Sequence, residues 1–201
     1  MTAATDLLAL QTEAQALLFR DARTANTFTD EPVTDDQVRA IYELVKWAPT
    51  SMNMQPLRVL LVRSEQARQR LVPHLMEGNR AKTASAPLVA ILSADTDFHE
   101  TLPRVFPHLP GAKDFYTDDD ARRETARLNA ALQVGYFILG VRAAGLAAGP
   151  MTGFDPEGVR REFFADTAQQ PLVIVNIGHP GEDAWFGRSP RLEYDEVVTA
   201  V

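Results

Sequence analysis

The segment from Trp47 to Arg58 concentrates side chains that could bind a planar polar ligand. Four hydrogen-bonding residues lie within six positions, namely Thr50, Ser51, Asn53 and Gln55. Pro49 ends the helical pattern before them, and Pro56 restricts the backbone at the entry to the apolar run that follows. The alternative is an ordinary turn in which Ser, Thr and Asn side chains bond their own backbone, and spacing alone favours that alternative.

Other chemistry carried by side chains is poorly represented. The sequence contains no cysteine, which excludes disulfides and thiolate chemistry. The four histidines show no metal-ligand spacing, so no metal site is expected. Ser51 and Ser85 lack the Gly-x-Ser-x-Gly frame of a hydrolase nucleophile, and neither Gly-x-Gly-x-x-Gly nor a phosphate-loop motif is present. Any redox reaction would therefore depend on a bound cofactor.

Length and charge narrow the class of protein. The 201 residues are predicted to form one domain over 1–201. A formal net charge of −7 opposes binding to nucleic acid, so an anionic ligand would have to meet local positive charge. No apolar run approaches the roughly 20 residues of a membrane span. The first residues lack the basic start and apolar core of a signal peptide, and a cytoplasmic location is therefore expected.

The elements that would position these residues follow from hydrophobic periodicity. Helices are expected at 7–19, 34–48, 65–80, 121–144 and 155–164, and strands at 59–62, 87–92 and 171–178. Thr34 and Gln37 have the spacing of a capping box. Between 146 and 154, small residues would allow backbone to approach a ligand closely. The sequence therefore predicts a chain that mixes helices and strands.

Three further stretches suggest surfaces that other groups cover. The helix at 121–144 is apolar almost all round in its second half, which favours a central core position, a subunit interface or both. Residues 93–117 read as a long surface excursion, which either covers a site or merely packs on the domain. The tail after His179 is expected to dock, and a partner subunit is one place where it could do so.

Two motifs resemble the nitroreductase family of flavin mononucleotide (FMN) enzymes. The run from Pro49 to Pro56 is similar to the family's Pro-Ser-Ser-x-Asn-x-Gln-Pro, and Ala22 to Phe28 resembles its N-terminal Arg-x-Ser-x-Arg/Lys-x-Phe. The likeness extends from about Leu18 to Val198 and is closest to the branch that contains the malonic semialdehyde reductases. It implies an α+β fold with a central mixed sheet flanked by helices, in an intertwined homodimer.

The resemblance also implies which residues would hold FMN, with the cofactor at the subunit interface. Phosphate and ring edge would be held by the N-terminal motif, the ribityl chain and pyrimidine edge by the residues after Gly78, and N5 by the backbone of the 150–153 loop. The last part of the site would come from the other subunit through residues 49–55. The implied set is Arg23, Thr24, Asn26, Pro49, Thr50, Ser51, Asn53, Gln55, Asn79, Lys82, Pro150, Met151, Thr152, Gly153, Arg188 and Arg191.

The activity implied is ping-pong hydride transfer through flavin N5, from NAD(P)H to a small aldehyde, a nitroaromatic or a quinone. No side chain is assigned as a catalyst, and Lys82 would stabilise the reduced ring. Two departures from the family pattern are present: Ala22 and Asn26 replace basic residues, and Thr152 replaces a glutamate common in that loop. The replaced basic position at Ala22 leaves open a non-catalytic flavin-binding homodimer. A different activity on the same scaffold, such as a dehydrogenase forming a double bond, is a further alternative.

Overall fold

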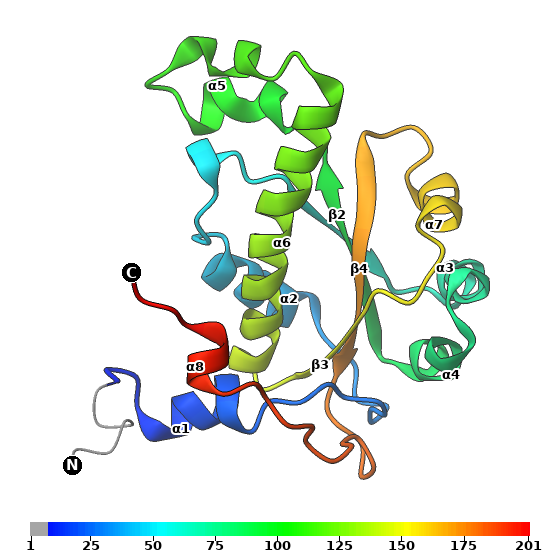
Figure 1. Ribbon diagram of the computed structural model, residues 1–201. Coiled ribbons are helices and arrows are strands. Elements are labelled where there is room, and N and C mark those ends of the chain that lie inside the picture. The colour runs from blue at the N-terminus through cyan, green and yellow to red at the C-terminus, as the bar shows by residue number, and fades with distance from the viewer. Residues whose placement is uncertain (1–7) are drawn as a thin grey trace.

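A four-stranded sheet organises the computed structural model, which describes residues 8–201; Leu7, which the first predicted helix includes, lies outside them (Figure 1). The strands are β1 (Leu57–Val62), β2 (Leu88–Asp95), β3 (Ala147–Met151) and β4 (Gln169–Gly178). Their order is β1-β2-β4-β3, and every adjacent pair is antiparallel. The α+β class is confirmed, but the prediction of a mixed sheet is wrong. The prediction also missed β3, whose small residues lack the β-branched composition typical of strands.

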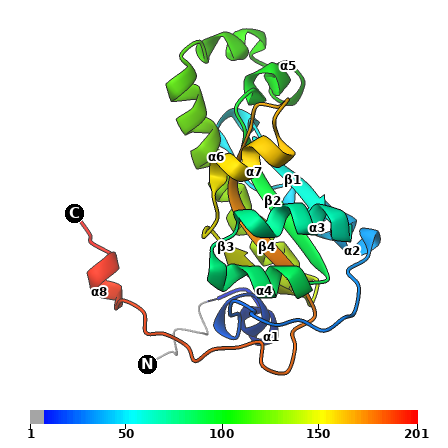
Figure 2. The same cartoon turned by 90° about the vertical axis from the view of Figure 1, so that its right-hand side faces the viewer.

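Helices cover both faces of this sheet (Figures 1 and 2). On one face, α2 (Asp35–Val45) and α6 (Asp119–Ala143) pack against Leu88, Ala90 and Leu92 of β2. On the other, α3 (Glu65–Leu71), α4 (Glu77–Ser85) and α7 (Pro156–Phe163) lie over the sheet, with Val89 and Ile91 in the shared core. This alternation follows from the two-residue period of a strand, and it explains why β2 is apolar on both faces.

The remaining helical elements are short. They are α1 (Thr12–Gln15), η2 (Ala16–Arg20), η3 (Ser51–Asn53), η4 (Val72–His74), η5 (Phe98–Thr101), α5 (Leu102–Val105), η6 (Pro110–Phe115) and α8 (Tyr194–Val197). The single helix predicted for 65–80 is instead divided, because Pro73 interrupts it before α4 begins. The surface excursion at 93–117 contains three of these short elements, η5, α5 and η6. Within residues 8–201, no helix is long and apolar enough to cross a membrane.

Local capping signals are confirmed where hydrogen bonds identify them. Thr34 accepts from the amide of Gln37, whose side chain in turn accepts from the amide of Thr34, which completes the predicted capping box. Asp118 accepts from the Ala121 amide at the start of α6. Asp155 is the N-cap residue of α7 and Pro156 begins the helix, although the Asp155 side chain makes no capping hydrogen bond.

Helices α2 and α6 approach each other most closely at a glycine. A Cβ atom added at Gly140 would overlap Cγ1 of Val45 and lie 3.2 Å from Cγ2 of Ile41. Both neighbours are β-branched and buried, so they have few alternative rotamers. Gly140 therefore sets the distance between the two helices that cover this face of the sheet.

Gly140→Ala is expected to destabilise the fold by roughly 1–2 kcal/mol, because overpacking outweighs the gain in helix propensity. Urea unfolding at fixed protein concentration measures the effect. The matched control is Gly135→Ala in the same helix, where an added Cβ meets nothing within 4 Å and stability should not fall. Adding Val45→Ala should recover part of the loss caused by Gly140→Ala. A Gly140→Ala protein more stable than the original would contradict this account.

One face of α6 is left without a cover in the described chain. Leu128, Leu132 and Tyr136 follow each other at four-residue spacing and are 63%, 50% and 43% exposed. The prediction of burial on several sides is therefore incomplete for one chain. The tail from Trp185 onwards is also exposed, and Figure 2 shows α8 standing away from the body of the molecule.

Candidate functional site

Residues 25–28, near the start of the described chain, and 180–184, near its end, lie together beside β3. The Ala25 amide donates to the Ala148 carbonyl (3.1 Å), and the Asn26 amide donates to the Ala184 carbonyl (3.0 Å). Phe28 and Pro180 form an antiparallel bridge close by. Gly149 makes this approach possible, because a Cβ there would lie 2.7 Å from the Ala25 carbonyl oxygen. The N-terminal motif is thus held against the sheet, with the C-terminal segment beside it.

A cavity of about 360 Å³ lies between these two segments. Its lining, all of it in the described chain, is Ala22, Arg23, Thr24, Asn26, Arg142, Phe186, Gly187, Arg188, Ser189 and Arg191. Four of these residues are arginines and none is a carboxylate. In a chain with a net charge of −7, such a concentration of positive charge favours an anion. Arginine forks are well suited to phosphate oxygens.

Backbone carbonyls orient the arginines without neutralising them. Arg23 donates to the Phe186 carbonyl (3.3 Å), and its guanidinium lies 5.6 Å from the ring centre of Trp185. Arg188 donates to the carbonyls of Arg20 and Ala22. Because a carbonyl carries no net charge, the cavity keeps its positive potential. Arg188 also ties the tail to the N-terminal motif.

Arg142, at the end of α6, is a member of this cavity that the sequence did not reveal. It donates to the Leu18 carbonyl (3.3 Å), and its buried Nε has no hydrogen-bond partner among residues 8–201. Burial lowers the pKa of the Arg142 guanidinium from its ordinary value. A buried donor without a partner is costly, while the same guanidinium contributes positive charge to the lining of the cavity. One arginine in an apolar helix gives no sequence signal of such a role.

At the end of β3, residues 152–153 and α4 form a second polar site. The Asn79 side chain donates to the Gly153 carbonyl (2.9 Å), which also accepts from the Met76 amide (3.0 Å). The amides of Thr152 and Gly153 donate to no residue in 8–201. Lys82, three residues after Asn79 on the helix, is half-buried. Two neighbouring amide donors without acceptors can bind an electronegative atom of a ligand.

The segment 49–55 adopts a strained backbone. Met52, Asn53 and Gln55 have φ values of 50°, 51° and 44°, and no other described residue except glycine has a positive φ. The left-handed region is unfavourable for side chains such as methionine and glutamine, and such strain concentrates at functional sites. This conformation distinguishes the segment from an ordinary helix-to-strand turn.

Two buried polar residues of α6 support this strained segment. Asn129 accepts from the Ser51 amide (2.8 Å), and Gln133 accepts from the Leu57 amide (3.0 Å). They lie four residues apart on one helix face, and both are less than 9% exposed. The sequence did not reveal them, because isolated polar residues in a helix usually face solvent.

Side chains within the segment are partly committed to internal contacts. Asn53 donates to the Val105 carbonyl (2.8 Å), and Gln55 donates to Oδ1 of Asn53 (3.0 Å). The Thr50 hydroxyl accepts from the Gln55 amide (3.2 Å). The internal bonding of the alternative interpretation is therefore present, although the strain and the buried supports exceed what an ordinary turn requires. Pro49 and Ser51 are left exposed.

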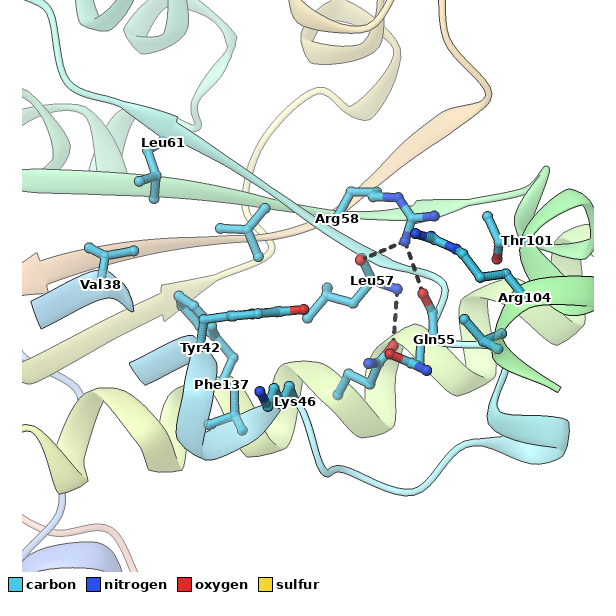
Figure 3. Close-up of a pocket in the computed structure, with 14 residues that line it drawn as sticks. Val38, Tyr42, Lys46, Gln55, Leu57, Arg58, Leu61, Thr101, Arg104 and Phe137 are labelled. Carbon is cyan, nitrogen blue, oxygen red and sulfur yellow. Dashed lines mark hydrogen bonds between the residues drawn. The ribbon is translucent and has the colours of Figure 1, made fainter. Parts of the chain in front are cut away.

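Beside this segment lies a larger cavity of about 530 Å³ (Figure 3). Its walls come from α2, β1, α5 and α6 and include Tyr42, Leu57, Val105 and Phe137. Arg58, which donates to the Gln55 and Leu57 carbonyls as Figure 3 shows, is paired with Asp95 at 2.7 Å. With Tyr42, Leu44 and Trp47 exposed on and after α2, this is an extensive apolar surface.

Within one chain, the predicted site residues therefore fall into two groups. Arg23, Thr24, Asn26, Arg188 and Arg191 line the arginine cavity, and Asn79, Lys82 and the 150–153 loop lie on α4 and at the end of β3. Residues 49–55 contact α6 and the excursion instead, and the two cavities share no lining residue. A single chain brings the arginine-cavity residues together and brings Asn79 to Gly153, but it does not bring residues 49–55 to either.

Comparisons with known proteins agree with this architecture. The profile described as "Nitroreductase family" matches residues 20–179. A Streptomyces coelicolor protein named "Putative NADH dehydrogenase/NAD(P)H nitroreductase" is 68% identical, over 96% of this chain and 99% of its own length. A Bacillus subtilis crystal structure titled as a nitroreductase has a TM-score of 0.85 at 22% identity, covering 95% and 100% of the two chains. An Exiguobacterium sibiricum structure, titled as a nitroreductase in complex with FMN, has a TM-score of 0.84 at 20% identity, covering 95% and 98%. The chain belongs to the nitroreductase family.

Proposed function

We propose that the protein is an FMN-dependent NAD(P)H oxidoreductase. The single observation that carries this proposal is the four-arginine cavity beside the start of β3, together with the free amides of Thr152 and Gly153 after the end of that strand. Arginine side chains suit a phosphate group, and free backbone amides suit an electronegative ring edge. The names of a relative 68% identical to this chain and of a structure with the same fold in complex with FMN support the assignment. Bound FMN supplies the two-electron chemistry that a cysteine-free chain lacks.

The chain's own residues would bind and orient the cofactor. Arg23, Arg142, Arg188 and Arg191 would hold the phosphate, with Thr24 and Asn26 beside them. The amides of Thr152 and Gly153 would donate to the ring edge, and Lys82 would supply positive charge there. The Asn79 side chain is already bonded to the Gly153 carbonyl, so it would shape the loop in addition to any ligand contact. No side chain is assigned as a covalent catalyst.

We further infer that the site is completed in a homodimer. Residues 49–55 lie apart from the arginine cavity in one chain, yet their strained backbone indicates a functional role. The uncovered stripe on α6 provides an apolar surface that a second copy can bury. A two-fold dimer would bring residues 49–55 of each subunit to the cofactor of the other. FMN would then lie at the subunit interface.

For the substrate, we propose a small aldehyde such as malonic semialdehyde, or a nitroaromatic or quinone, reduced with ping-pong kinetics. The motif likeness to the malonic semialdehyde reductase branch supports the aldehyde, while the relative's name supports the nitro compound. All three substrate types can accept two electrons from a reduced cofactor. Their relative kcat/KM values, measured with the same preparation, would rank them.

The visible spectrum of the freshly purified protein tests the proposal. Absorbance near ~450 nm should indicate bound flavin, and anaerobic NADH or NADPH should bleach it. Adding aldehyde, quinone or nitroaromatic should restore the absorbance. Flavin that neither nicotinamide bleaches would favour the non-catalytic flavin-binding homodimer. A protein that stays colourless after incubation with FMN would refute cofactor binding altogether.

A further inference from the structure

A chain of buried polar side chains crosses the apolar layer between α4 and the sheet. Asn176 of β4 donates through Nδ2 to the Thr83 hydroxyl (3.1 Å), and Thr83 donates to the sulfur of Met151 (3.7 Å). Asn176 and Thr83 are fully buried, and Met151 is 8% exposed. Around them the core is apolar, including Val89, Ile91 and Ile174 of the neighbouring strands.

Stability alone does not account for this chain. Oδ1 of Asn176 is buried and has no partner among residues 8–201, which costs free energy. Apolar side chains of the same shape would avoid that cost and fill the same space. The hydrogen bond between Asn176 and Thr83 is directional, however, and adds a geometric constraint on the place of α4 along the strand to that set by apolar packing. The polar chain therefore constrains the position of α4 rather than raising the free energy of unfolding.

A second contact between the same elements lies one helical turn away. Asn79 bonds the Gly153 carbonyl, while Thr83 bonds Met151. Residues i and i+4 of a helix are separated by about 6 Å, and residues i and i+2 of a strand by about 6.6 Å. The two spacings match, so the two bonds act as rungs between α4 and residues 151–153. Lys82 immediately precedes Thr83, and the free amide of Thr152 lies between the rungs.

We propose that Thr83 and Asn176 are positioning residues that fix α4 against residues 151–153. They would thereby set the distance between Lys82 and the free amides of Thr152 and Gly153. The proposal rests on the proposed function, because it assigns these groups to one FMN ring. Thr83 and Asn176 do not contact the cofactor themselves, since both are fully buried.

Arg68 also holds the C-terminal end of α4, where Thr83 lies. Arg68 of α3 donates to the carbonyls of Thr83, Ala84 and Ala86. Burial lowers the pKa of the Arg68 guanidinium from its ordinary value. These bonds cap the C-terminal end of α4 and join it to another helix, not to the segment at the end of β3. At the N-terminal end of α4, the Met76 amide also donates to the Gly153 carbonyl (3.0 Å) and Leu75 forms a bridge with Phe154. Thr83 is therefore the rung that extends the registration with residues 151–153 further along the helix.

The test compares Thr83→Val, which removes the hydroxyl but keeps the volume, with Thr83→Ser, which keeps the hydroxyl. The control is Thr96→Val, since Thr96 is also buried and bonded through its hydroxyl, to the Ala168 carbonyl (2.9 Å). FMN affinity is measured by fluorescence titration of the full-length protein, and amide hydrogen exchange is measured without flavin. Thr83→Val should bind FMN about tenfold more weakly, while Thr83→Ser and Thr96→Val should retain the original affinity. Exchange should accelerate at 77–85 and 151–154 in Thr83→Val alone.

A double variant, Thr83→Val with Asn176→Leu, separates position from stability. Replacing both partners by apolar groups should keep the fold stable, yet FMN should still bind about tenfold more weakly. This variant also decides the question if Thr83→Val alone does not fold. Unchanged affinity in the folded variants that carry Thr83→Val would overturn the proposal, and so would unchanged exchange at 77–85. If the original protein binds no FMN, the proposed function fails, while the exchange data still show whether the pair fixes α4.

Discussion

Arg23→Ala combined with Arg188→Ala is expected to weaken FMN binding at least about a hundredfold. Each arginine can form a charge-assisted bond to phosphate that contributes roughly 1.5–3 kcal/mol. No carboxylate lines the cavity, so none of its lining residues competes with phosphate for the arginines. The two residues belong to opposite ends of the described chain, and their loss removes both walls of the phosphate site. Fluorescence titration with FMN measures the effect.

Riboflavin provides the internal control for this prediction, because it has the same ring but no phosphate. Its affinity should be equal in the double variant and in the original protein. Arg161→Ala, on the exposed side of α7, is the matched control for the loss of an arginine and should bind FMN normally. An equal loss of FMN and riboflavin would show instead that Arg188 acts by holding the tail to Arg20 and Ala22. Unchanged FMN binding would refute the phosphate site.

Leu132→Arg is expected to convert a dimer into a monomer that no longer retains FMN. Leu132 lies at the centre of the α6 stripe, between Leu128 and Tyr136. A two-fold axis would place the new charge in the interface twice, and burying an unpaired charge costs several kcal/mol. Loss of the partner would also remove residues 49–55 from the site. Sedimentation gives the mass, and absorbance near ~450 nm gives the flavin content.

Leu109→Arg controls for this substitution, since Leu109 is 40% exposed but lies in the surface excursion. It should leave the mass of the assembly unchanged. A Leu132→Arg protein that stays dimeric would show that the stripe is not the interface. A monomer that retains FMN with the original affinity would contradict a site shared between subunits.

Much of the fold follows from local sequence, because its signals act over a few residues. The capping box at Thr34 and the apolar runs of β1, β2 and β4 could be predicted from the sequence. Strand β3 could not, since Ala147 to Pro150 lack the side chains that favour a strand. Strand direction also could not be predicted, because the pairing of β2 with β4 is a long-range contact that periodicity does not encode.

The residues of the candidate site likewise include some that could be predicted from the sequence and some that could not. Arg23 could be identified because it lies in a motif, and Arg188 because the family resemblance implies it; the structure places both in one cavity. Arg142, Asn129 and Gln133 could not, because each is a single polar position in a long helix. Only tertiary contacts show that Arg142 lacks a partner for Nε and that Asn129 holds the Ser51 amide. In one chain, the proposed dimer is indicated only indirectly, by the exposed apolar face of α6.

The pairing of the two chain ends has a consequence for the order of events during synthesis. The hydrogen bond from Arg23 to Phe186 spans 163 positions, so closing the arginine cavity requires nearly the whole polypeptide. Contacts of such separation form late, because the entropy of closing a long loop must be overcome first. A nascent chain still on the ribosome has its first arginine but not its last ones. Cofactor capture must therefore follow translation of the C-terminal segment, and flavin cannot assist the folding of shorter nascent chains through this cavity.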